Sequence, residues 1–141
     1  MTHRKFGRRG QAVVEFALVL PLVLMMVISV FEFARAWNIQ QVLTDAASEA
    51  ARVAVVGSGA GDPKGVIEAK VNTAISNALG VAAIDAGDAT VEVLGAGGGR
   101  GEPATVRIEL DHQFLFLGPL MAWTTDKSTL TLRTSVTMRN E

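Results

Sequence analysis

Glu15 has the most unusual surroundings of any charged residue in this chain. It lies four residues into an apolar stretch, and Gly10 stands five residues before it, where basic sequence gives way to apolar sequence. An ionised carboxylate is costly in a bilayer unless it is paired or lies at the interface. A cut between Gly10 and Gln11 would place a new ammonium about one helical turn from Glu15. That ammonium could pair with this carboxylate or with the Glu15 of a neighbouring subunit.

The same spacing admits a second interpretation. Glu15 would then lie at the level of the lipid headgroups, stabilised by the positive end of the helix dipole. Gly10 would be a flexible joint. Spacing alone favours neither interpretation, so both stay open at this point.

Other residue types that could carry chemistry lack suitable partners. His112 has the inward parity of an apolar strand, and no acid or serine is placed to form a triad or a metal site with it. The glycine-rich segment 95–101 is followed by Pro103 and a predicted strand, whereas a phosphate-binding loop needs a helix there, so we interpret it as a hairpin connection. The chain has no cysteine. We therefore expect no catalytic residue, no cofactor and no metal, and an enzyme is the least favoured class.

Composition limits the chain to one small domain and a membrane segment. It has 141 residues, of which 49% are hydrophobic and 19% charged, and its net charge is −1. Most of the apolar excess precedes Val56. No basic patch recurs after the first ten residues, which argues against nucleic acid as a partner.

The first part of the sequence predicts a single membrane-spanning helix. Residues 1–10 form a basic leader, and residues 16–31 contain no charge. With its flanks, the span covers 11–36, which exceeds the ~20 residues that a helix needs to cross a bilayer. The basic side should stay in the cytoplasm, and Trp37 would lie at the far interface. Pro21 lies inside the span and is expected to kink it.

The helix is predicted to continue beyond the membrane as an amphipathic segment, residues 37–56, and to stop at Gly57. Its apolar face is rich in alanine, which lets other elements approach closely. We expect the rest of the chain, residues 57–141, to dock on this alanine-rich stripe as a small extracytoplasmic domain. The residues that define the stripe and its flanks are Trp37, Ile39, Val42, Leu43, Ala46, Ala47, Ala50 and Ala54.

The remaining sequence predicts a short helix and three strands. Asp62 as N-cap and Pro63 at the first position begin the helix, and Gly80 ends it. The strands are expected at 90–94, 104–114 and 129–138. The fold class is therefore α+β: a three-stranded antiparallel sheet packed on the long helix. Residues 114–123 are more apolar than a solvent loop; we favour a role in the core over contact with the membrane surface or another subunit.

Residues 8–21, with the sequence RRGQAVVEFALVLP, resemble the N-terminus of TadE-like proteins. These are minor pilins, or pseudopilins, of the Flp/Tad type IV pilus and tight-adherence system. Gly10, Glu15 and Phe16 match the family's processing motif. Shorter similarities occur at 31–35, 46–52 and 135–141. The chain length fits a TadE or TadF type better than the shorter Flp pilin or the generally longer TadG type.

The resemblance implies that prepilin peptidase cuts between Gly10 and Gln11, and that Glu15 and Phe16 set the register of assembly. The expected partners are this peptidase, other pilins (TadF-, TadG- or Flp-like), the inner-membrane assembly platform and the lipid bilayer. The expected location is the bacterial inner membrane, with the N-terminus in the cytoplasm. The alternative is a secreted or single-pass anchored binding domain unrelated to pili, because residues 34–36 also form an A-x-A signal-peptidase pattern.

Overall fold

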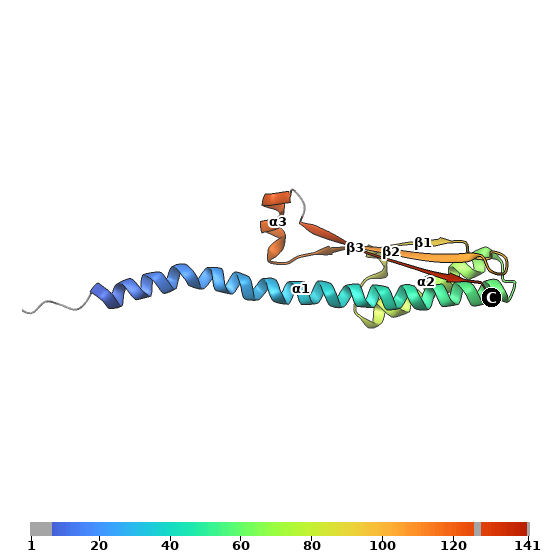
Figure 1. The fold of residues 1–141 in the computed structure, drawn as a ribbon, viewed down its shortest axis with the longest axis horizontal. Helices are drawn as coiled ribbons and strands as arrows, with labels where there is room; N and C mark the ends of the chain where they lie inside the picture. The colour runs from blue at the N-terminus through green and yellow to red at the C-terminus, as the bar shows by residue number, and fades with distance from the viewer. Residues whose placement is uncertain (1–6, 126–127, 141) are drawn as a thin grey trace, which may run out of the picture.

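The computed structural model describes residues 7–125 and 128–140 of the chain. One long helix, α1 (Gly7–Gly59), runs the length of the molecule, and a smaller helix and a three-stranded sheet pack on its C-terminal half (Figure 1). We call this packed part the helix-and-sheet unit. The arrangement confirms the predicted α+β class with a long apolar N-terminal helix. Residues 1–6 of the predicted basic leader lie outside the described residues.

Helix α1 is longer than the sequence predicts at both ends. It already includes Gly7 and stays helical through Pro21, so the kink expected there remains a prediction. Gly57 does not end the helix, which is a correction. A Cβ at Gly57 would lie 3.0 Å from Cγ1 of Ile67, so this glycine lets the second helix approach closely. The left-handed residue that follows the helix is Gly61, with φ of 74°.

Helix α2 (Lys64–Val81) begins differently from the prediction. Pro63 is extended (φ −57°, ψ 144°) and lies outside the helix, and no side chain caps the first turn. Asp62 is therefore not an N-cap; it accepts a 2.6 Å hydrogen bond from Nζ of Lys70. At the other end the helix passes Gly80, because the left-handed turn falls at Ala83 (φ 56°).

The sheet consists of β1 (Ala89–Leu94), β2 (Pro103–Gln113) and β3 (Thr129–Arg139) in the order β1-β2-β3, with both pairs antiparallel. A short 3-10 helix, η1 (Ala86–Asp88), precedes β1. The three strands predicted from period-two alternation are confirmed, with ends shifted by one residue. On β2, Val106, Ile108 and Leu110 face the core, as alternation requires.

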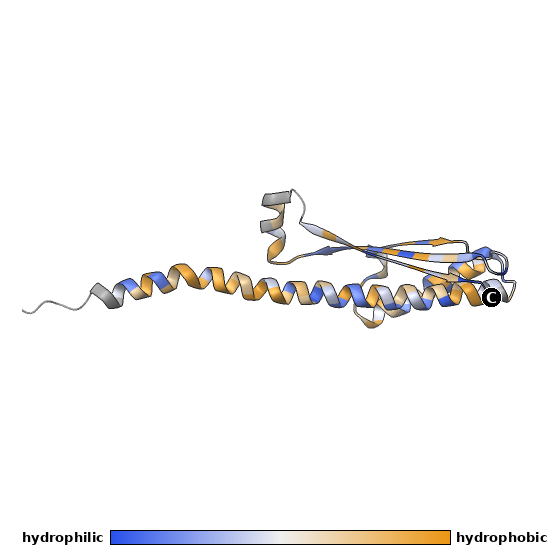
Figure 2. Cartoon of the chain, viewed as in Figure 1, coloured by the Kyte–Doolittle hydropathy of each residue, from blue (hydrophilic) through white to orange (hydrophobic). Residues whose placement is uncertain are grey.

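The core lies where the alanine-rich stripe of α1 meets the sheet and α2. Small side chains allow the helix to approach both closely, and the predicted docking of the stripe is confirmed. Figure 2 shows hydrophobic residues continuing along α1 from its free half into this packed half. The fully buried members of the stripe and the α2 residues that join them in one cluster are Leu43, Ala46, Ala47, Ala50, Ala54, Ile67, Val71, Ile75 and Leu79.

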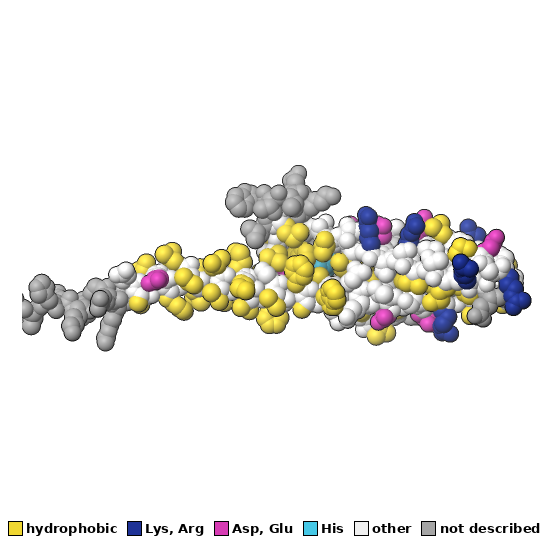
Figure 3. All heavy atoms as spheres, viewed as in Figure 1, with side chains coloured by type: hydrophobic (Ala, Val, Ile, Leu, Met, Phe, Trp, Pro, Cys, Tyr) yellow, Lys and Arg dark blue, Asp and Glu magenta, His cyan; other side chains and the backbone are white. Residues whose placement is uncertain are grey.

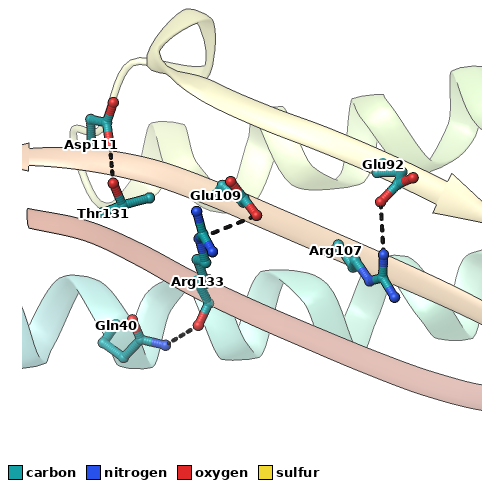
Figure 4. Close-up of polar contacts among 7 residues, drawn as sticks. All are labelled: Gln40, Glu92, Arg107, Glu109, Asp111, Thr131 and Arg133. Carbon is teal, nitrogen blue, oxygen red and sulfur yellow. Dashed lines mark hydrogen bonds and ion pairs between the residues drawn. The ribbon is translucent and has the colours of Figure 1, made fainter.

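The opposite face of the sheet carries cross-strand polar pairs (Figure 4). Arg107 pairs with Glu92 at 3.2 Å and Arg133 with Glu109 at 3.3 Å. Both pairs are exposed and contribute little stability. The side-chain amide of Gln40 on α1 donates a 2.9 Å hydrogen bond to the carbonyl oxygen of Arg133, which ties α1 to β3.

One element was not predicted. Between β2 and β3 the chain forms helix α3 (Leu117–Thr125), within the segment that the sequence left without a secondary structure. Figure 1 shows α3 at the end of the sheet nearest the free half of α1, running across the direction of α1 instead of along it.

Candidate membrane and assembly surface

The N-terminal half of α1 is a rod of exposed apolar side chains. The segment Gly10–Ser58 is long and apolar enough to cross a membrane, and its most apolar window is not buried by any other described part of the chain. Figure 3 shows yellow hydrophobic side chains along this rod, whereas charged side chains gather on the helix-and-sheet unit. The large exposed residues are Val13, Val14, Phe16, Leu18, Leu22, Leu24, Met26, Val30, Phe31, Phe33 and Trp37. An apolar surface of this extent marks contact with lipid or with other subunits.

The predicted processing and register residues lie on this rod. Gly10, Gln11, Glu15 and Phe16 are all exposed in α1. Gln11 and Glu15 are four residues apart, so they share one face of the helix. Glu15 forms no ion pair within the part of the chain whose side chains the structure describes.

A polar clamp joins α1 to the start of α3. The two carboxylate oxygens of Glu32 accept hydrogen bonds from the backbone N–H groups of Phe116, at 2.6 Å, and Leu117, at 2.9 Å. These N–H groups lie at the N-terminus of a helix, where donors lack intrahelical partners and the helix dipole favours negative charge. Glu32 thus caps a helix that begins 85 residues later in the sequence.

Aromatic side chains surround the clamp. The rings of Phe33 and Phe114 lie 6.4 Å apart, and Phe114 meets His112 edge-on at 5.1 Å. A shallow pocket beside them is lined partly by Glu32 and Arg35. We call this region the collar; its members are Phe31, Glu32, Phe33, Arg35, His112, Phe114, Leu115 and Phe116.

His112 is buried on the inward face of β2, as its strand parity predicts. Burial lowers the pKa of His112, the charge of Arg35 lowers it further, and Glu32 opposes the shift. The neutral imidazole is thus the form that the fold favours. Among the described residues, no three His, Asp or Glu side chains gather in a way that could hold a metal ion.

The glycine-rich segment 95–101 connects β1 and β2, as predicted. Its shape depends on left-handed glycines at 95, 97 and 101. Asn140 holds it in place: its side-chain amide donates to the carbonyl oxygen of Gly98 at 3.1 Å, and its own carbonyl oxygen accepts from Gly101 N–H at 2.7 Å.

Sequence reasoning missed the Glu32 clamp. Its signal in the sequence was an acidic residue at the end of an apolar run. Gly118 and Pro119 could have suggested a helix start, since proline is tolerated in a first turn. Glu32 and Leu117 are 85 residues apart in the sequence, so no local pattern indicated that they interact.

The fold and its surfaces define a class: an α+β chain whose long, exposed, apolar N-terminal helix is a candidate single-pass membrane anchor. Residues 10–52 match the model of the TadE-like protein family. This match confirms the predicted resemblance over the segment that contains Gly10, Glu15 and most of the alanine-rich stripe. It indicates an involvement in Tad pilus systems, in a family that is typically non-enzymatic. Comparison with curated proteins and with solved structures found no match.

Proposed function

We propose that this protein is a minor pilin or pseudopilin that takes part in assembling a Flp/Tad type IV pilus for surface adhesion. The observation that carries the proposal is that the TadE-like match, residues 10–52, contains the apolar rod, whose most apolar window is not covered by any other described part of the chain. A structural subunit needs such a surface, first to reside in lipid and then to pack against other subunits. Its role is therefore assembly and not catalysis.

Processing between Gly10 and Gln11 by prepilin peptidase is part of this proposal. Gly10 is helical and exposed, and a Cβ added there would meet nothing within 4 Å. Glycine inside a helix costs about 1 kcal/mol relative to alanine. Packing in this chain therefore gives no reason for glycine at this position, whereas recognition by a peptidase would.

Assembly would then use the new N-terminus. Cleavage creates an ammonium at Gln11, one helical turn from Glu15, and an apolar environment strengthens the attraction between opposite charges. Pairing between the Gln11 amine of one subunit and Glu15 of the next would fix their axial register, with Phe16 packing beside the pair. The apolar surface of α1 would fill the contacts around it.

We further propose the following organisation. Residues 1–10 are a cytoplasmic leader, 11–36 span the inner membrane, 37–56 continue the helix outside it, and 57–141 complete an extracytoplasmic domain. Basic residues in the leader favour this orientation. The partners are the peptidase, other pilins (TadF-, TadG- or Flp-like) and the inner-membrane assembly platform.

The first test is the N-terminus of the membrane-associated protein, measured by mass spectrometry with and without a prepilin peptidase. A peptidase-dependent start at Gln11 is expected, and Gly10→Ala should reduce it. Gly65→Ala is a matched control, because Gly65 is also helical, exposed and without close neighbours. A start at Met1 under both conditions would contradict the proposal and leave a plain anchored domain. A start at Trp37 would indicate a secreted domain.

A further inference from the structure

We propose that α3 is an interfacial helix that lies on the lipid headgroups of the bilayer through which α1 passes. The ligand of this surface is a phospholipid membrane and not a second protein. The inference rests on the membrane-spanning role of α1 given above, and the experiment below separates the failure of one from the failure of the other.

The position of α3 along α1 matches the thickness of a bilayer. From Gln11 to Phe31 there are 21 residues, which at 1.5 Å per residue span about 32 Å. A hydrocarbon core is ~30 Å thick. If residue 11 lies at one boundary of the hydrocarbon core, Glu32 lies at the other, and residues 32–36 of the proposed span pass through the headgroup layer. The hydrogen bonds of Glu32 to Phe116 and Leu117 bring the start of α3 to the level of that boundary.

The direction of α3 also suits an interface. α3 runs across the direction of α1 (Figure 1), so a helix α1 that crosses the membrane leaves α3 roughly in the membrane plane. The Glu32 clamp holds the N-terminus of α3 beside α1. It also satisfies two backbone donors that have no partner within the helix.

The surface around the clamp is apolar on every element that contributes to it. Phe31 is 72% exposed and Phe33 65% on α1, while Leu115 is 73% exposed and Phe116 62% before α3. Residues 114–125 contain no charged side chain. Aromatic and apolar side chains of this kind are favoured at the boundary between hydrocarbon and headgroups.

Two features favour lipid over a second copy of the chain as the occupant. The exposed Leu115 and Phe116 lie beside Glu32, next to the exposed apolar residues of α1. The lipid that surrounds α1 at this level would therefore also contact the residues before α3. Arg35 lies in the collar, is exposed and forms no ion pair with another described side chain. A guanidinium in this position is suited to bidentate contact with a lipid phosphate.

The absence of cysteine makes a direct test possible with the full chain. Single variants Ala122→Cys on α3, Leu24→Cys on the rod and Ala60→Cys at the far end of the molecule are spin-labelled and reconstituted in phosphatidylcholine/phosphatidylglycerol vesicles. All three positions are exposed. The accessibility of each label to oxygen and to a water-soluble nickel complex then reports its depth in the bilayer.

The expected result is a high oxygen-to-nickel ratio at Leu24, a low one at Ala60, and an intermediate one at Ala122 that is several-fold above Ala60. A ratio at Ala122 equal to that at Ala60, with Leu24 still in lipid, overturns the interfacial position of α3. Protection of Ala122 from both reagents, with dipolar broadening between labels, also overturns it in favour of a second copy. A low ratio at Leu24 instead overturns the membrane-spanning role of α1.

A second arm tests the clamp. Glu32→Ala in the Ala122→Cys background removes both acceptors and should increase the motion of the label and abolish its defined depth. Glu49→Ala is the matched control, because this acid lies on the same helix but pairs only with the exposed Arg52. An unchanged spectrum for Glu32→Ala would show that Glu32 does not hold α3 at the interface.

Discussion

Gly95, the first residue of the connection between β1 and β2, cannot be replaced without cost. Its φ is 72°, and a Cβ there would overlap the carbonyl oxygen of Pro103. Gly101 has a similar φ of 84°, but a Cβ there would meet nothing within 4 Å. Substitution of Gly101 therefore introduces backbone strain alone, whereas substitution of Gly95 introduces both strain and steric overlap.

We predict that Gly101→Ala lowers the free energy of unfolding by about 1–2 kcal/mol, the cost of a left-handed alanine. Gly95→Ala should lower it by about 1–3 kcal/mol more, because the backbone must move to relieve the overlap. Denaturant unfolding of the full chain in micelles, followed by far-UV circular dichroism, measures both. Equal losses for the two variants would contradict this account of Gly95.

His112 makes stability depend on pH. Its pKa is lowered in the fold, chiefly by burial, so the unfolded chain binds a proton more readily. Stability is then fully present above about pH 6.5, the ordinary histidine pKa, and is lost as pH falls from there toward the lower pKa of the folded state. We expect the thermal midpoint to drop between pH 7.5 and pH 5.

His112→Gln should flatten this dependence, because the amide does not titrate. The window lies above the range in which most carboxylates protonate, so their contribution is small there. Thermal unfolding midpoints of both proteins, measured by circular dichroism at steps of half a pH unit, test this prediction. A wild-type midpoint that does not change over the window, or an equal drop in the variant, would contradict the assignment.

At the level of single residues, the sequence predicted features that depend only on neighbouring positions in the chain. The inward position of His112 followed from strand parity. Gly10 and Glu15 stand out by their spacing, and their roles stay predictions. Gly57 was misinterpreted, because a glycine that ends a helix and one that admits a neighbouring helix have the same local context. Only the position of Ile67 in space separates the two cases.

Among the elements, the close packing of α1 against the sheet depends on its alanine-rich stripe. Ala50 is fully buried in the cluster that α1 forms with α2 and the sheet. Ala50→Leu inserts volume that the core cannot accommodate, and overpacking of this kind costs about 1–3 kcal/mol. We expect a lower unfolding midpoint for the helix-and-sheet unit.

Ala69→Leu supplies the comparison, since Ala69 is helical but exposed on α2. The same substitution there should change the midpoint little, because leucine and alanine have similar helix propensities. Thermal unfolding of both variants in the same detergent makes the test. If both lower the midpoint equally, the stripe is not a tight contact.

Elements with a clear period could be predicted, and the others could not. α1, α2 and the three strands showed apolar spacing that matched their secondary structure. α3 had no such pattern, because most of its residues are apolar and its Gly118-Pro119 pair is typical of a turn. Its N-terminus is stabilised by Glu32, whose contribution no local window contains.

For the whole molecule, Glu15 is the residue on which assembly is expected to depend. Glu15→Gln keeps the size of the side chain and removes its charge, so the proposed pairing with the Gln11 amine is lost. We predict normal insertion and cleavage but few or no pili, counted by electron microscopy. Glu49→Gln, which loses only an exposed pair with Arg52, should assemble normally. Wild-type numbers of pili with stably expressed Glu15→Gln would contradict the register role.

The arrangement of the whole chain was foreseeable because it follows from two patterns in sequence. An apolar run with a basic flank predicts a membrane segment, and an amphipathic helix before alternating strands predicts a sheet packed on that helix. The sequence did not indicate where the sheet begins along the rod. The position of the sheet along α1 depends on the contacts of the collar, in which Glu32 accepts a hydrogen bond from Phe116.

Since α1 is unbroken from Gly7 to Gly59, the azimuth of the sheet is coupled to the azimuth of the apolar rod. One inserted residue between the two halves would turn the sheet by about 100° and raise it by about 1.5 Å. Seven would nearly restore its bearing while raising it by about 10 Å. Subunits that pack against the apolar rod and fix its rotation about the α1 axis therefore also fix the direction in which the sheet faces.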